Sequence, residues 1–204
     1  MGRIARLISF VRATAGNAKT SDVKVDRGGG DNRTAQHFSA PGDDSFPLPG
    51  DYVQLDSQAG TGRDSATGYL DPDNEQKANA GDKRIYARDA NTGDEVVEVW
   101  LKNDGTAEVR NDEGVIILSP NGTVSSSNGS GSFTLSNSGS ITGTNSNGSF
   151  SLESGGDFVV NGAKIDTNGR FTDGDGLVFN THTHDQGADS DGDSEQPVDA
   201  PRNP

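Results

Sequence analysis

The chain has 204 residues, of which only 29% are hydrophobic, together with 28 glycines and a formal net charge of −14. A compact domain of this length usually contains more apolar residues, so the composition leaves partial disorder or an elongated, repetitive fold. The acidic balance argues against general nucleic-acid binding, and no nucleic-acid partner is expected. There is no cysteine, which excludes disulfide bonds, and no apolar run approaches the roughly 20 residues of a membrane-spanning helix.

The first 20 residues are basic and carry apolar residues at helical spacing. Ile4, Leu7, Ile8 and Val11 follow the i, i+3, i+4, i+7 pattern of one helical face. We therefore expect an amphipathic helix over residues 1–20. A helix docked on an acidic partner protein is favoured over one packed on its own domain, because the rest of the chain is acidic. A signal peptide is disfavoured, since the apolar run is short and flanked by arginines.

Short alternating segments separated by turn residues occupy residues 21–95. The candidate strands are 21–25, 34–38, 52–55 and 83–87. This pattern predicts a small β barrel or sandwich, with a long polar loop between residues 59 and 80. His37 is expected to be an ordinary strand or surface histidine, because no cluster of possible metal ligands accompanies it.

A regular series of turn glycines runs through residues 96–178. From Gly105 to Gly156 the spacing alternates between 9 and 8 residues, and most of these glycines follow Asn, Asp or Ser. The second residue after the glycine is usually apolar, and the positions between are mostly Ser, Thr or charged. These apolar residues are Ala107, Ile116, Val124, Phe133, Ile141, Phe150, Phe158, Phe171 and Val178. The alternation predicts about ten short strands with one apolar face.

A flexible linker is the simplest alternative for the glycine-rich region, because residues 119–157 are mostly Gly, Ser or Asn. A linker, however, has no need for apolar residues at a fixed distance from evenly spaced glycines. One chain cannot bury the apolar face of such short strands, whereas three chains around an axis bury it and remove exposed edges. We therefore expect an intertwined homotrimeric β-helix, or β-prism. A single-chain β-solenoid is the rival, although its coils usually have 20 residues or more.

Two of the three histidines of the chain follow the repeat. His182 and His184 lie at i and i+2, so on a strand both leave the same face. Counting alternate residues from Val178 places them on the apolar face, where three chains bring six imidazoles to the axis. Six nitrogen donors suit an octahedral metal: Fe(II) fits, Ni(II) and Co(II) stay open, and Zn(II) prefers four ligands. An ion enclosed in this way is structural.

The segment after His184 is acidic and ends in prolines. Its Asp-x-Asp-Gly-Asp run, residues 189–193, resembles a calcium loop in part but lacks the spacing to the bidentate glutamate of an EF-hand. We expect instead a solvated tail that folds back over the tip.

Three segments together resemble the central spike, or baseplate assembly protein V-like, family of contractile-tail bacteriophages. They are Arg84-Ile85-Tyr86-Ala87-Arg88-Asp89, then Trp100-Leu101-Lys102-Asn103-Asp104-Gly105-Thr106, and Thr181-His182-Thr183-His184 followed by the acidic tail with Gln196-Pro197. The likeness extends from about Asp22 onward. It implies a mainly β protein with an OB-fold-like domain over 21–95, a trimeric β-helix over 96–178 and an apex over 179–204. In that apex, His182 and His184 of three chains hold one iron ion.

The resemblance also implies a function. Proteins of this family lie at the tip of the contractile tail, under the baseplate hub, and pierce the host outer membrane when the tail contracts. A homotrimeric virion protein attached to the hub through its N-terminal region is therefore expected, with no catalytic residues. A tail fibre or tailspike adhesin for host glycans is the alternative, but it needs outward aromatics where Ser, Thr and Asn predominate. A metalloenzyme needs an open site and a third ligand, and Asp185 is expected on the face opposite the histidines.

Overall fold

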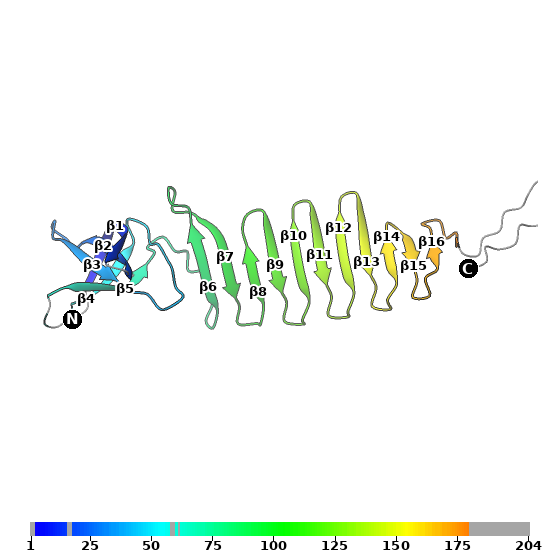
Figure 1. The fold of residues 1–204 in the computed structure, drawn as a ribbon, viewed down its shortest axis with the longest axis horizontal. Helices are drawn as coiled ribbons and strands as arrows, with labels where there is room; N and C mark the ends of the chain where they lie inside the picture. The colour runs from blue at the N-terminus through cyan, green and yellow to red at the C-terminus, as the bar shows by residue number, and fades with distance from the viewer. Residues whose placement is uncertain (1–2, 16–17, 58–59, 61, 180–204) are drawn as a thin grey trace, which may run out of the picture. The chain divides into compact units, whose positions relative to one another are not determined.

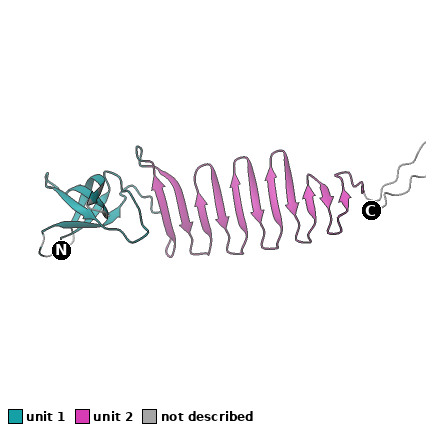
Figure 2. Ribbon diagram, in the orientation of Figure 1, with its two compact units in different colours: residues 1–77, 90–93 teal, residues 78–89, 94–204 magenta. Residues whose placement is uncertain are grey.

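The computed structural model of the protein describes residues 3–15, 18–57, 60 and 62–179. Every regular element in these ranges is a β-strand, so the prediction of a mainly β protein is confirmed (Figure 1). In the same ranges no helix is long and apolar enough to span a membrane. The chain divides into two compact units, residues 1–77 with 90–93, and residues 78–89 with 94–204 (Figure 2).

The first unit is a closed barrel of five strands. They are β1 (Arg3–Ala15), β2 (Ala18–Asp26), β3 (Asn32–His37), β4 (Tyr52–Ser57) and β5 (Asp64–Leu70). The order around the barrel is β1-β2-β3-β5-β4, and β4 pairs back onto β1. The β3–β5 pair is parallel and the other pairs are antiparallel. The buried core of the barrel consists of Ala5, Leu7, Phe10, Val23, Val25, Ala35, Val53, Leu55 and Ala66.

The predicted helix over residues 1–20 is wrong, because residues 3–15 form a strand of the barrel. The inward residues of β1 are Ala5, Leu7 and Phe10, at most 9% exposed. The outward apolar residues of β1 are Ile4, Ile8 and Val11, at least 38% exposed. The β1–β2 register shifts between Leu7 and Ser9, and such a bulge adds one residue to the strand. The extra residue moves the inward positions from odd to even numbers, and the resulting spacing imitates a helix.

The boundary predicted at residue 95 is also displaced. The segment predicted as the last strand of the barrel domain is β6 (Lys83–Arg88), and it pairs with β7 (Glu95–Leu101) in the second unit. The loop predicted over residues 59–80 contains β5, which closes the barrel. That strand escaped prediction because its buried residues are small: Ser65 and Ala66 are 8% and 0% exposed.

The second unit is one antiparallel sheet of eleven strands, ordered β6 to β16 as in the chain. After β6 and β7 come β8 (Ala107–Arg110), β9 (Gly114–Leu118), β10 (Val124–Asn128), β11 (Gly131–Leu135), β12 (Ile141–Asn145), β13 (Gly148–Leu152), β14 (Phe158–Val160), β15 (Ala163–Ile165) and β16 (Phe171–Thr172). Each strand pairs with its neighbours in sequence, so the unit is a single layer (Figure 1). The predicted series of short strands separated by glycine turns is confirmed.

Two kinds of turn alternate along this sheet. Two-residue loops follow Asn111, Asn128 and Asn145, and each Asn side-chain oxygen accepts backbone N–H bonds from the next turn residues. The turns between them are three-residue loops that end in a glycine with φ between 77° and 92°, as at Gly105 and Gly122. Left-handed backbone of this kind strains any side chain, which explains every second glycine of the even series. The glycines between them, Gly114, Gly131 and Gly148, have no positive φ, and an added Cβ there would come within 3.0 Å of another residue.

Candidate functional site: an exposed apolar face

One face of the eleven-stranded sheet carries a continuous row of apolar residues, because each is the cross-strand partner of the next. This first row is Leu101, Ala107, Leu118, Val124, Leu135, Ile141, Leu152, Phe158, Ile165 and Phe171. Phe179 extends it: its N–H donates to the Phe171 carbonyl over 3.0 Å, and the two ring centroids lie 4.9 Å apart.

A second row lies beside the first on the same face. It consists of Ile85, Val99, Val109, Ile116, Ser126, Phe133, Gly143, Phe150, Val160 and Ala163. Gly143 lets the ring of Phe150 lie against the neighbouring backbone, since a Cβ at position 143 would be 2.3 Å from that ring. We call the two rows together the apolar face.

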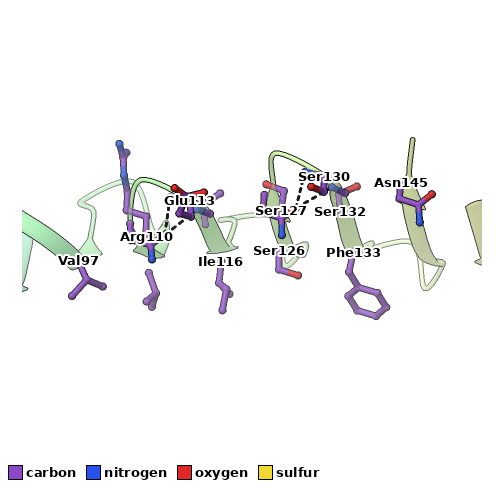
Figure 3. A pocket seen from close by; sticks show the side chains of 16 residues that line it. Val97, Arg110, Glu113, Ile116, Ser126, Ser127, Ser130, Ser132, Phe133 and Asn145 are labelled. Carbon is purple, nitrogen blue, oxygen red and sulfur yellow. Dashed lines mark hydrogen bonds between the residues drawn. The ribbon is translucent and has the colours of Figure 1, made fainter. Parts of the chain in front are cut away.

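The apolar face has no cover within the described chain. Apart from Ile141, which is half-buried, its large residues are between 37% exposed, at Phe171, and 58% exposed, at Ile85. Every member of the buried core cluster among the described residues belongs instead to the barrel. Shallow grooves of about 690 and 480 Å³ are lined by residues of both faces and of the turns, and both include Phe133. Contiguous apolar patches of this extent mark interaction surfaces. Figure 3 shows Ile116 and Phe133 on one side of the sheet, with Ser127 and Ser132 on the other.

The opposite face, which we call the polar face, begins with a cluster of ion pairs on β6–β8. The Arg84 guanidinium bonds the carboxylates of Glu98 and Glu95, and Arg110 Nε lies 3.1 Å from Glu98. Glu98 is only 5% exposed, and a carboxylate so buried needs these partners. Lys102 bonds Glu108 in the same cluster. The charges are therefore paired within one chain.

Trp100 lies at the centre of that cluster. The Arg84 guanidinium is 5.8 Å and the Lys102 ammonium 4.9 Å from its ring centroid. Its indole N–H donates to the Asp82 carboxylate over 3.1 Å. Hydrogen bonds from the backbone N–H groups of Asn79 and Asn103 hold the pKa of Asp82 below its ordinary value, and the Trp100 bond adds to this. The alternation of charged residues with Ile85, Val99 and Val109 in the sequence could have predicted a charged face on these strands.

Further along the sheet the polar face carries hydroxyl groups in place of charges. Two cross-strand rows run over β10–β13: Ser125, Thr134, Thr142 and Ser151, and beside them Ser127, Ser132, Thr144 and Ser149. The hydroxyls of Ser132 and Thr144 lie 2.8 Å apart and hydrogen-bond across the strands.

The histidines predicted to bind metal, His182 and His184, lie outside the described residues. The count that assigned them to the apolar face started at Val178, and the structure pairs Val178 with Thr172 on the polar face. That step of the prediction is wrong. β16 has two residues, so the following turn begins after Thr172 and not after an apolar residue. Phe179 is the next residue on the apolar face, and metal binding by the two histidines stays a prediction.

Within the described ranges no group of three or more His, Asp or Glu side chains is placed to hold a metal. His37 lies at the end of β3, with its ring 5.3 Å from Phe10 and 5.2 Å from Tyr69. Burial lowers the pKa of His37, while the charge of Asp43 acts in the opposite direction. Burial also raises the pKa of Tyr69 to about 12, and its hydroxyl has no hydrogen-bond partner in the described part of the chain.

No protein-family model matches the sequence, and no curated protein matches it. Among solved structures, the TCP10 domain of Danio rerio CPAP aligns with 82% of this chain and 96% of that domain, at 14% identity and a TM-score of 0.35. The same domain in complex with a peptide of Danio rerio STIL aligns at 12% identity over 83% and 97%, with a TM-score of 0.34. Similarity at this level assigns neither a family nor a function.

The two faces of this unit differ sharply in chemistry. A single-layer sheet presents a narrow apolar strip on one side and self-paired charges and hydroxyls on the other. Burying the strip against similar strips removes a large apolar area from water, at roughly 25 cal/mol per Å². The apolar face is therefore the candidate functional site.

Proposed function

We propose that the protein is the central spike of a contractile phage tail, a structural virion protein that punctures the host outer membrane. The apolar face carries this proposal, because a sheet with two apolar residues per strand and no core of its own needs other sheets to cover it. Three copies around an axis would bury both rows and direct the polar faces outward. Their narrow, fully hydrogen-bonded shaft would transmit an axial force.

The barrel supports the same proposal. A five-stranded barrel in the order β1-β2-β3-β5-β4, with a parallel β3–β5 pair, has the strand order of an OB-fold. The resemblance of the sequence to central spikes implies such a domain ahead of the shaft. On β1, the outward Ile4 is 75% exposed and stands between Arg3 and Arg6. This basic and apolar strand is the surface we assign to the baseplate hub, in place of the helix expected from the sequence.

His182 and His184 would hold one Fe²⁺ per trimer at the apex. They follow closely after Phe171 and Phe179, the last described pair of the apolar face. Six imidazole nitrogens would occupy all six coordination positions of an octahedral metal ion. The ion would therefore join the three chains and have no position left for a substrate. Other octahedral metals fit the same donors.

The adhesin alternative has less support. An adhesin needs free aromatic rings on the outward surface to stack on sugars. Tyr86 and Trp100, two aromatic residues of the polar face, are both stacked with Arg84. We therefore prefer the spike.

Solution mass together with elemental analysis of the purified full-length protein tests the proposal. We expect a trimer at micromolar concentration with one iron per three chains. The double variant His182→Ala/His184→Ala should lose the metal and keep the trimer, because the apolar face is untouched. A monomeric or dimeric wild-type protein would contradict the spike.

A further inference from the structure

We propose that strands β9–β13 form an uncharged belt that occupies the hydrocarbon core of the bilayer while the spike crosses the membrane. The belt is the segment from Gly114 to Leu152. This inference rests on the trimeric spike proposed above, in which the polar face of each sheet points outward. It adds which part of the shaft lies in the lipid and what the outward side chains contribute.

The charge distribution of the chain is the first argument. Charged residues make up 24% of the sequence, yet none occurs among the 39 residues from Gly114 to Leu152. Charges stand directly on both sides, at Glu113 and Glu153. The four turns that join these strands are uncharged as well as the strands themselves. A belt without charge therefore surrounds the whole shaft over this length.

The length of the belt is the second argument. It contains five neighbouring strands, β9 to β13, stacked side by side in the sheet. Neighbouring strands lie about 4.8 Å apart, so the belt extends about 24 Å along the stacking direction. The hydrocarbon core of a typical bilayer is about 30 Å thick, and the bacterial outer membrane is thinner than average. The belt thus matches the layer in which a charge is most costly.

The side chains of the belt are the third argument. A polar group in hydrocarbon is costly unless it is hydrogen-bonded. The Ser132 and Thr144 hydroxyls bond each other, and the side-chain oxygens of Asn128 and Asn145 accept backbone N–H bonds in their turns. The polar face of β9 also carries two apolar residues, Val115 and Ile117, which alternate with the apolar-face residue Ile116. The backbone is paired by strands on both sides. The belt consequently enters lipid at a lower cost than the charged strands before and after it.

Force spectroscopy on a supported bilayer tests the belt. The full-length trimer, held by its N-terminus on a cantilever, is driven into the bilayer, and its dwell time there is measured. The test variant is Ser127→Lys/Ser149→Lys, whose sites are exposed on the polar face. The control variant, Ala90→Lys/Asn168→Lys, places the same charges on exposed turn residues outside the belt. Ser127→Asn/Ser149→Asn changes the belt sites without charge.

We expect the belt lysines to shorten the dwell time by at least about tenfold, because one lysine at the bilayer centre disfavours insertion by on the order of 100-fold. Both other variants should behave as the wild type. Equal effects of the belt and control lysines would overturn the inference and leave the spike intact. A wild-type protein that is not a trimer, or does not cross under load, would overturn the proposed function itself. If the lysine pair prevents assembly, the single Thr144→Lys variant decides by the same criterion.

Discussion

The barrel and the sheet solve the problem of burying apolar residues in opposite ways. In the barrel, the strands curl around their own core, and Val23, Val25 and Val53 are fully buried within one chain. In the sheet, residues of the same kind stay exposed, with Phe133 at 45% and Leu118 at 47%. The barrel thus buries its apolar residues within one chain, whereas the sheet leaves its apolar face uncovered, and the proposed assembly of three chains would cover it.

The largest expected effect comes from a charge on the apolar face. Phe133→Asp should abolish assembly, because burying an unpaired carboxylate costs about 3–5 kcal/mol. In the proposed trimer each of the three chains would bury one such carboxylate. Sedimentation should show monomers. Ser132→Asp, on the next residue and the opposite face, is the matched control and should remain trimeric. Equal behaviour of the two variants would show that the apolar face is not an interface.

A core deletion in the barrel should have a smaller effect of a different kind. Val53→Ala removes two methyl groups from a fully buried site and should lower the free energy of unfolding by about 2 kcal/mol. The loss should not depend on protein concentration, because the barrel core lies within one chain. Denaturant unfolding at two concentrations measures it, with exposed Gln54→Ala as the control. A concentration-dependent loss would indicate that the barrel also needs partners.

Two glycines of the β10–β11 hairpin should respond differently to alanine. A Cβ at Gly131 would lie 2.5 Å from the Thr144 carbonyl oxygen, so Gly131→Ala should destabilise the sheet by about 1–3 kcal/mol. Gly129, two residues earlier, has nothing within 4 Å of a built Cβ and no positive φ. Gly129→Ala should leave the melting temperature unchanged or slightly raised. A similar loss in both would mean that turn flexibility, and not strand spacing, sets the effect.

The smallest expected effect concerns acid stability near Trp100. The pKa of Asp82 is lowered in the folded chain, so its contribution is fully present above the unfolded value of about 3.9. The contribution is lost as the pH falls through the lowered pKa. Asp82→Asn should therefore weaken amide-exchange protection at Asn103 at neutral pH. The difference from wild type should shrink in strong acid, and a difference that grows there would contradict the assignment.

The sequence predicted the sheet better than the barrel, and the reason is local. In the sheet, each turn needs a glycine in a left-handed conformation or an asparagine that caps the loop. The turns can therefore be recognised in the sequence from evenly spaced Gly and Asn residues. In the barrel, β5 is buried by Ser65 and Ala66, and neither residue stands out in a search for apolar alternation. The bulge between Leu7 and Ser9 changed the period of β1, and the spacing of its apolar residues then resembled a helix.

The candidate site was predictable in outline and failed at one residue. The apolar positions after Gly105 through Gly156 were correct, because the second residue after each of these glycines lies in one of the two rows of the apolar face. Val178 broke the rule because β16 ends on Thr172. The alternation of apolar residues gives no information about strand length. The wrong face assigned to Val178 was therefore carried over to every residue counted after that turn. The ion-pair cluster of Arg84 and Glu98 was visible as alternating charges, but its cross-strand register was not.

The pairing of each strand with only its sequence neighbours has an evolutionary consequence. Gly114, Gly131 and Gly148 recur 17 residues apart, one hairpin at a time. Duplicating or deleting one such hairpin leaves every other pairing in place and changes the length of the sheet by about 10 Å. The closed barrel permits no such change, because losing one strand opens it. Related proteins are therefore expected to vary in length by whole hairpins within this half of the chain, and in the proposed spike such changes would match the shaft to cell envelopes of different depth.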